Sequence, residues 1–139
     1  RQQPELGQRL VGRQLVVRRR RAQVSGFLPR GRHLLADLHG VAPERLTDPV
    51  AIEALLREAA RAAGSTPVGG HFHPFGPDRG VTGVLLLKES HISIHTWPEH
   101  GFAAVDVFMC GDARPERAVD VIEATLAAGS VSLREVARG

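Results

Sequence analysis

Three strand patterns follow one another between residues 84 and 110, and only short turns separate them. Residues 84–87 form an apolar run that is typical of a buried strand. Residues 102–110 form the third of these strands, which ends at the only cysteine of the chain. Between them, residues 91–97 alternate, which predicts one face with Ile92, Ile94 and Thr96 and another face with His91, Ser93, His95 and Trp97.

Helix signals flank these strands on both sides. Thr47-Asp48-Pro49 predicts a helix start, because a capping oxygen precedes a proline in the first turn. Gly64 is expected to end this helix, and Asp112-Ala113-Arg114-Pro115 repeats the start signal for a second helix that runs to Gly129. Both segments carry apolar side chains at helical spacing: Ile52, Leu55, Leu56, Ala59, Ala60 and Ala63 in the first, and Ala118, Val121, Ile122, Thr125 and Leu126 in the second.

Three further strands complete the pattern, at residues 33–38, 66–72 and 131–136. The second of these is weakened by Pro67 and by Gly69-Gly70, and a loop rich in turn formers follows it at residues 74–80. The order of elements predicts an α/β (α+β) two-layer sandwich, in which a mostly antiparallel sheet carries both helices on one face. The similar order in the two halves suggests an internal duplication.

Composition is that of one globular domain. The chain has 139 residues, of which 42% are hydrophobic and 24% are charged, and no apolar run approaches the roughly 20 residues of a membrane span. A single cysteine and the absence of an apolar signal segment favour a cytoplasmic protein. The net charge of +3 comes mostly from Arg13 and Arg18–Arg21. We therefore expect residues 1–28 to be a mobile basic extension, with an RNA-binding arm as the alternative, and residues 29–139 to be the domain.

The central block matches a known pattern. It reads Glu89-Ser90-His91, then Ile94-His95-Thr96-Trp97-Pro98-Glu99, then Ala103-Ala104-Val105-Asp106 and Cys110-Gly111. This block resembles the bacterial-type S-adenosylmethionine decarboxylase proenzymes, which are small pyruvoyl-dependent enzymes, and the similarity covers about the last four-fifths of the chain. The resemblance implies a cytosolic lyase that makes the aminopropyl donor for spermidine synthesis. It also implies a homodimer with active sites at the subunit interface.

The resemblance further implies a cofactor made from the protein itself. The Ser90 hydroxyl would attack the Glu89 carbonyl, and the ester so formed would break to leave a pyruvoyl group on residue 90. A carbonyl that forms a Schiff base with the substrate amine supplies the electron sink that decarboxylation requires. No metal is expected. Pyridoxal phosphate is not expected either, since Lys88 is the only lysine that could hold it and no glycine-rich phosphate cradle is present. The proenzyme would thus be cleaved between residues 89 and 90.

Further side chains take roles that the resemblance implies. His95 is the expected base for breaking the ester, and its position five residues after Ser90 would let it fold back toward the Glu89–Ser90 bond. Cys110 is the expected proton donor in turnover. Thr82 falls where the family commonly has serine, and its hydroxyl would assist processing. For His33, His39, His71 and His100, we expect satisfied surface or half-buried groups.

The substrate pocket is expected from the same resemblance. Phe75 and Trp97 have motif neighbours like those of adenine-stacking positions, with burial in the core as the alternative for each. Glu99 is the expected partner for the ribose hydroxyls or for the sulfonium charge. Two departures from the family pattern bear on this pocket: the loop 75–80 is one residue longer than usual, and Val41 replaces a common cysteine.

Three other functions are compatible with parts of the pattern. The same chemistry could act on ornithine or arginine, since both reactions need Ser90, His95 and Cys110. An uncleaved, non-enzymatic paralogue could use the basic segment to bind a partner. A zinc site would have as candidate ligands His71, His73, His91, His95 and Cys110, but their spacing forms no closed four-ligand pattern.

Overall fold

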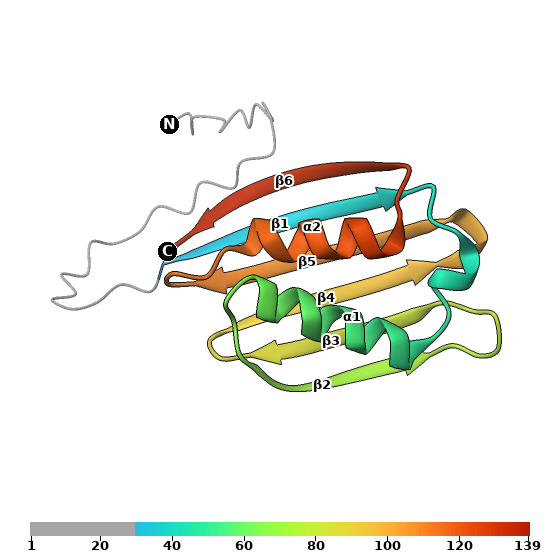
Figure 1. The fold of residues 1–139 in the computed structure, drawn as a ribbon, viewed down its shortest axis with the longest axis horizontal. Coiled ribbons are helices and arrows are strands. Elements are labelled where there is room, and N and C mark those ends of the chain that lie inside the picture. Colours follow the sequence, from blue (N-terminus) through green and yellow to red (C-terminus); the bar gives the residue numbers. More distant parts are fainter. Residues whose placement is uncertain (1–29) are drawn as a thin grey trace, which may run out of the picture.

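A computed structural model describes residues 30–139 of the chain as one six-stranded sheet with two α-helices and two short 3₁₀ helices (Figure 1). The predicted basic extension at residues 1–28 lies outside the described residues. The elements in chain order are β1 (Gly31–His39), η1 (Pro43–Arg45), α1 (Pro49–Ala62), β2 (Pro67–Pro74), β3 (Val81–Leu87), β4 (Ser90–Trp97), η2 (Pro98–His100), β5 (Phe102–Cys110), α2 (Pro115–Leu126) and β6 (Ser130–Arg138).

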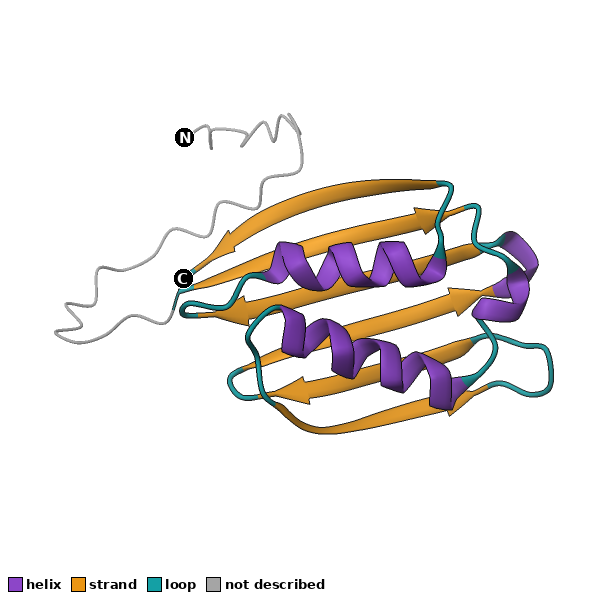
Figure 2. Ribbon diagram, viewed as in Figure 1, coloured by secondary structure: helices purple, strands orange, loops and turns teal. Residues whose placement is uncertain are grey.

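The sheet has the spatial order β2-β3-β4-β5-β1-β6, and every neighbouring pair is antiparallel. Both α-helices lie side by side on one face of the sheet, which leaves the other face open (Figure 2). The predicted two-layer α/β sandwich is therefore confirmed. The order also places β1 between β5 and β6, so the first strand of the domain lies next to strands that are far from it in the sequence.

The first helix begins where its sequence signal predicts. The Asp48 side chain accepts hydrogen bonds from the backbone N–H groups of Val50 and Ala51 at 2.9 and 3.4 Å, and Pro49 occupies the first turn. Helix α2 lacks such a side-chain cap and ends at Leu126, three residues before the predicted stop at Gly129. Its buried face also departs from the predicted stripe.

In α2 the difference concerns three positions. Val119 is buried, Val121 is half-buried and Thr125 is exposed, because the helix turns its packed face slightly away from the one that the apolar spacing indicated.

A surface ion cluster also joins this helix to the sheet. The guanidinium of Arg32 contacts the carboxylate of Glu116 at 2.9 Å and that of Glu135 at 2.5 Å. These contacts connect β1, the first turn of α2 and β6 at the surface.

The hydrophobic core lies between the helices and the sheet. Ile92 and Ile94 of β4 are completely buried on this side, as the alternating pattern predicts. Thr96 is the buried polar residue of the same row, and its hydroxyl is fully used. The Thr96 Oγ1 atom accepts a hydrogen bond from the backbone N–H of Val81 at 2.8 Å and donates one to the carbonyl of Leu46 at 2.7 Å.

The open face of the sheet carries both apolar and polar side chains. Its apolar part comprises side chains that are between 36% and 52% exposed, namely Leu35, Val84, Leu86, Trp97 and Val136. Its polar part includes the side chains that the sequence placed together on one face of β4. Among residues 30–139, no helix has the length and apolar character that crossing a membrane requires.

Candidate active site

The predicted cleavage site lies at one end of the sheet, where a two-residue turn of Lys88 and Glu89 joins β3 to β4. Leu87 and Ser90 pair across this turn, and the end of β5 lies beside it. The backbone N–H of Cys110 donates to Ser90 Oγ at 3.3 Å, and the Cys110 thiol points to the carbonyl oxygen of Glu89 at 3.5 Å. The structure thus brings together Glu89, Ser90 and Cys110.

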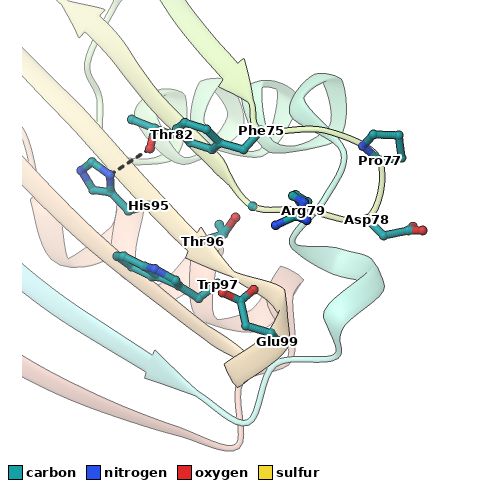
Figure 3. Close-up of a pocket in the computed structure, with 10 residues that line it drawn as sticks. Phe75, Pro77, Asp78, Arg79, Thr82, His95, Thr96, Trp97 and Glu99 are labelled. Atoms are coloured by element: carbon teal, nitrogen blue, oxygen red, sulfur yellow. Dashed lines mark hydrogen bonds between the residues drawn. The ribbon is translucent and has the colours of Figure 1, made fainter.

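His95 lies at the opposite end of β4. Its Nδ1 atom is 3.1 Å from the hydroxyl of Thr82, with which it pairs across β3 and β4 (Figure 3). Because β4 runs without interruption from Ser90 to Trp97, a rise of ~3.3 Å per residue places His95 about 16 Å from Ser90. The expectation that His95 folds back toward the Glu89–Ser90 bond of its own chain is therefore wrong.

A cavity of about 700 Å³ opens beside Thr82 and His95. Its walls come from the loop between β2 and β3, from β4 and from η2. The side chains of Phe75 and Trp97 are 58% and 39% exposed, so neither belongs to the core. The view of the cavity shows aromatic, acidic and basic side chains around one hollow (Figure 3). The lining residues are Phe75, Pro77, Asp78, Arg79, Gly80, Thr82, His95, Thr96, Trp97 and Glu99.

One part of the predicted site therefore lines the cavity, and the other part lies at the end of the sheet. Phe75, Trp97 and Glu99 line the cavity together with Thr82 and His95, whereas Ser90 and Cys110 do not. Within one chain, the predicted substrate pocket and the predicted cleavage site are thus separate.

Asp106 organises a third polar group on the open face, which the sequence analysis missed. Its Oδ2 atom lies 2.5 Å from Nε2 of His33 and 3.0 Å from Nε2 of His91, and the hydroxyl of Ser93 bonds to its Oδ1 atom. The guanidinium of Arg138 lies 3.2 Å from Nδ1 of His33. Because arginine can only donate, this contact assigns the His33 proton to Nε2, from which it bonds to Asp106.

Two signals in the sequence could have pointed to this group. Asp106 is the only charged residue of an otherwise apolar strand, and the strand alternation places it on the open face with His91. The expectation that His33 is a half-buried and satisfied group is confirmed by its two hydrogen bonds. The partner strand of His33 could not be read from the sequence, because β1 is distant from β5 along the chain.

The same group contains residue types that could bind a metal ion. Among residues 30–139, His33, His91 and Asp106 are the ligand types that converge, with their ligand atoms within 4.8 Å of one another. Of these three residues, only His91 is among the zinc ligands that the sequence suggested. Hydrogen bonding accounts for the arrangement, since three donors satisfy the carboxylate and the Arg138 guanidinium faces the other nitrogen of His33.

Comparison with known proteins places the chain among decarboxylases. A family described as S-adenosylmethionine decarboxylase matches residues 32–139. An S-adenosylmethionine decarboxylase proenzyme of Sulfurihydrogenibium sp. is 54% identical over 81 residues, which are 58% of this chain and 60% of that protein. The proenzyme of Symbiobacterium thermophilum is 47% identical over 110 residues, which are 78% of this chain and 83% of that protein.

A solved structure supports the same relationship. The crystal structure of the adenosylmethionine decarboxylase from Aquifex aeolicus superposes with a TM-score of 0.74 at 43% sequence identity. The superposition covers 80% of this chain and 92% of the other.

Proposed function

This chain belongs to the S-adenosylmethionine decarboxylase family, and from that premise we propose that it is a self-processing decarboxylase that acts on S-adenosylmethionine. Its product would serve as the aminopropyl donor for spermidine synthesis. The observation that carries the proposal is the convergence of the Ser90 hydroxyl, the Glu89 carbonyl and the Cys110 thiol at the end of the sheet. The lone free thiol favours a reducing compartment, which supports a cytoplasmic location.

Self-cleavage begins at the Ser90 hydroxyl. Its oxygen attacks the carbonyl carbon of Glu89, the bond from that carbon to the nitrogen of residue 90 breaks, and the hydroxyl proton passes to the released amine. The Cys110 thiol, 3.5 Å from the Glu89 oxygen, is placed to donate a hydrogen bond as negative charge develops there. Loss of the Cα proton of residue 90 then expels the Glu89 carboxylate, and hydrolysis releases ammonia and leaves a pyruvoyl group on residue 90.

These residues fit the pyruvoyl group that the family implies. When present, that group supplies the electron sink for decarboxylation. In the uncleaved chain the backbone N–H of Cys110 donates to Ser90 Oγ, and the pairing of β4 with β5 keeps Cys110 beside residue 90 after that oxygen has left with the Glu89 carboxylate. We propose that Cys110 returns a proton to the substrate Cα after carbon dioxide leaves. No metal and no pyridoxal phosphate enter this scheme.

We propose that the working enzyme is a homodimer whose sites are shared between subunits. His95 is too far from Ser90 of its own chain to take the Cα proton, so the partner subunit's His95 would act instead, positioned by Thr82. The open face of the sheet supports this pairing, because it exposes an apolar surface that no described helix covers. Leu35, Val84, Leu86 and Val136 would be buried in the interface.

The cavity supports the choice of substrate. Phe75 and Trp97 offer two exposed aromatic surfaces for stacking of an adenine base, and Glu99 offers a carboxylate for the ribose hydroxyls or for the sulfonium charge. A volume of about 700 Å³ suits a nucleoside-sized ligand. Ornithine and arginine lack an aromatic ring that would use both surfaces, so they are the less suitable substrates.

The intact mass of the purified protein, measured beside a Ser90→Ala variant under denaturing conditions, tests the chemistry. We expect two fragments that meet between Glu89 and Ser90, with a pyruvoyl cap on the second, and an intact chain for the variant. Carbon dioxide release from S-adenosylmethionine, ornithine and arginine then tests the substrate. An uncleaved wild-type chain would exclude the pyruvoyl enzyme and favour a non-enzymatic binding protein, whereas activity on ornithine or arginine alone would refute the substrate assignment.

A further inference from the structure

Glu89 adopts a left-handed backbone conformation, with φ of +59°. Within residues 30–139, only two other non-glycine residues have positive φ, namely Asp78 and Ala127. Turns that require positive φ normally place glycine there, which has no Cβ atom, or asparagine, whose short polar side chain can hydrogen-bond locally to the backbone. A glutamate in this position is therefore unfavourable for the turn itself. It directly precedes the bond that the proposed self-cleavage breaks.

The surroundings of the turn hold Glu89 in this conformation. The backbone N–H of Lys88 donates to the carbonyl of Thr66 at 3.1 Å, which fixes the start of the turn. The pairing of Leu87 with Ser90 fixes both strands at its base. On the far side, the Cys110 thiol contacts the Glu89 carbonyl oxygen at 3.5 Å. Contacts outside the residue thus maintain a conformation that the isolated turn would avoid.

The source of the unfavourable energy is close to the reacting atoms. In the left-handed region, the Cβ atom of a residue crowds its own carbonyl oxygen. In Glu89 this carbonyl is the one that Ser90 would attack. When the carbonyl carbon becomes tetrahedral, its oxygen leaves the plane of the peptide, and the crowding with Cβ decreases. The strain therefore raises the energy of the intact chain more than that of the transition state.

We propose that Glu89 is a positioning residue whose left-handed strain accelerates the attack of Ser90 on the Glu89 carbonyl. This inference rests on the proposed self-cleavage and deepens it. The atoms balance within the chain: the bond from Ser90 Oγ to the Glu89 carbonyl carbon forms, the bond from that carbon to nitrogen breaks, and the hydroxyl proton goes to the amine. The Cβ atom of Glu89 is the part that matters here, since its carboxylate has no assigned partner in this step.

The prediction is that removal of Cβ slows the first step. Glu89→Gly retains the turn but removes the crowding. If all of the strain were relieved in the transition state, its loss would slow acyl transfer about five- to thirty-fold. Since only part of the strain is relieved there, we expect the rate to fall about three- to ten-fold. Glu89→Gln and Glu89→Ala keep Cβ and should react at nearly the wild-type rate. Glu89→Asn keeps Cβ in a residue that tolerates this conformation, so its rate should be intermediate.

The assay follows freshly synthesised chain in time, with hydroxylamine added to cut the ester as soon as it forms. Denaturing electrophoresis then gives the rate of the acyl transfer itself. Ala127→Gly is the matched control, because Ala127 has φ of +49° at the end of α2 and takes no part in the site. It should gain thermal stability and keep the wild-type rate. In a Ser90→Ala background, Glu89→Gly should also gain thermal stability, because strain is lost.

The outcomes distinguish failure of the proposed self-cleavage from failure of the proposed role of strain at Glu89. A wild-type chain that never cleaves refutes the proposed function. A wild-type chain that cleaves, with a Glu89→Gly variant that is as fast, refutes the role of strain alone. A slow Glu89→Gly variant that is less stable in the Ser90→Ala background also refutes it, because loss of rigidity would then explain the rate. A slow and more stable variant supports the proposal.

Discussion

A shared active site can be tested by dividing its two parts between two inactive chains. One chain carries Ser90→Ala and keeps His95, while the other carries His95→Ala and keeps Ser90 and Cys110. Each chain alone should remain largely uncleaved. When the two are produced together, a mixed dimer contains one complete site, in which Ser90 of one subunit meets His95 of the other.

The expected magnitude follows from the distance within β4 and from symmetry. About 16 Å separates Ser90 from His95 in one chain, far beyond hydrogen-bonding reach, so rescue must come from the partner subunit. With random pairing of subunits, about half of the dimers are mixed and each has one complete site, so about one quarter of all chains should be cleaved. Only the chain that carries His95→Ala should be cut.

The assay uses two different affinity tags and intact-mass analysis of the co-purified dimer. The matched control pairs the His95→Ala chain with a chain that carries both Ser90→Ala and His95→Ala. No dimer then contains His95, so no rescue is expected. Absence of cleavage in the first pair, or wild-type cleavage of the His95→Ala chain alone, would show that the site is not shared in this way.

Other predictions concern stability and substrate binding. Thr96→Val should lower the free energy of unfolding by about 2–4 kcal/mol, because the Val81 N–H and the Leu46 carbonyl both lose their partner; thermal denaturation beside Thr96→Ser checks this. Trp97→Ala should raise KM for S-adenosylmethionine about ten-fold or more and leave cleavage unchanged. Steady-state assays measure KM and intact-mass analysis measures cleavage; an unchanged KM would contradict the prediction. The pKa of Glu116 is lowered by its backbone N–H in the first turn of α2 and by Arg32. The stabilisation of the fold by the ionised Glu116 carboxylate is therefore present at neutral pH and lost as acid protonates it. Glu116→Gln should reduce the melting temperature at pH 7 but not in acid. Equal reductions at both pH values would refute this reasoning.

Patterns that depend on neighbours in the chain could be read from the sequence. The alternation of β4 assigned His91 and His95 to one face and Ile92 and Ile94 to the core, as the structure confirms. The start of α1 followed from Asp48, whose side chain satisfies backbone groups two and three residues away. Such interactions span a few residues, so the residue types at fixed spacing are sufficient to predict them.

The departures from prediction have a common cause in tertiary packing. The open face of the sheet was expected, but the meeting of His33 with Asp106 was not, since it needs β1 to lie between β5 and β6. The expectation for His95 failed because β4 stays extended from Ser90 onward, held by hydrogen bonds to strands on both sides. A period of two residues gives the face of a strand but does not give its neighbour.

Local patterns along the chain were sufficient to predict the strands, the α-helices, the face of each strand, and the types of residue available for chemistry. Which of those residues meet depends on the packing of the whole sheet. Ser90 and Cys110 are 20 residues apart. They meet because β4 begins and its antiparallel neighbour β5 ends at the same end of the sheet. His95 lies on the same strand as Ser90 and is held away from it. Strand pairing acts across long stretches of chain, and its register depends on how the whole sheet packs against its helices.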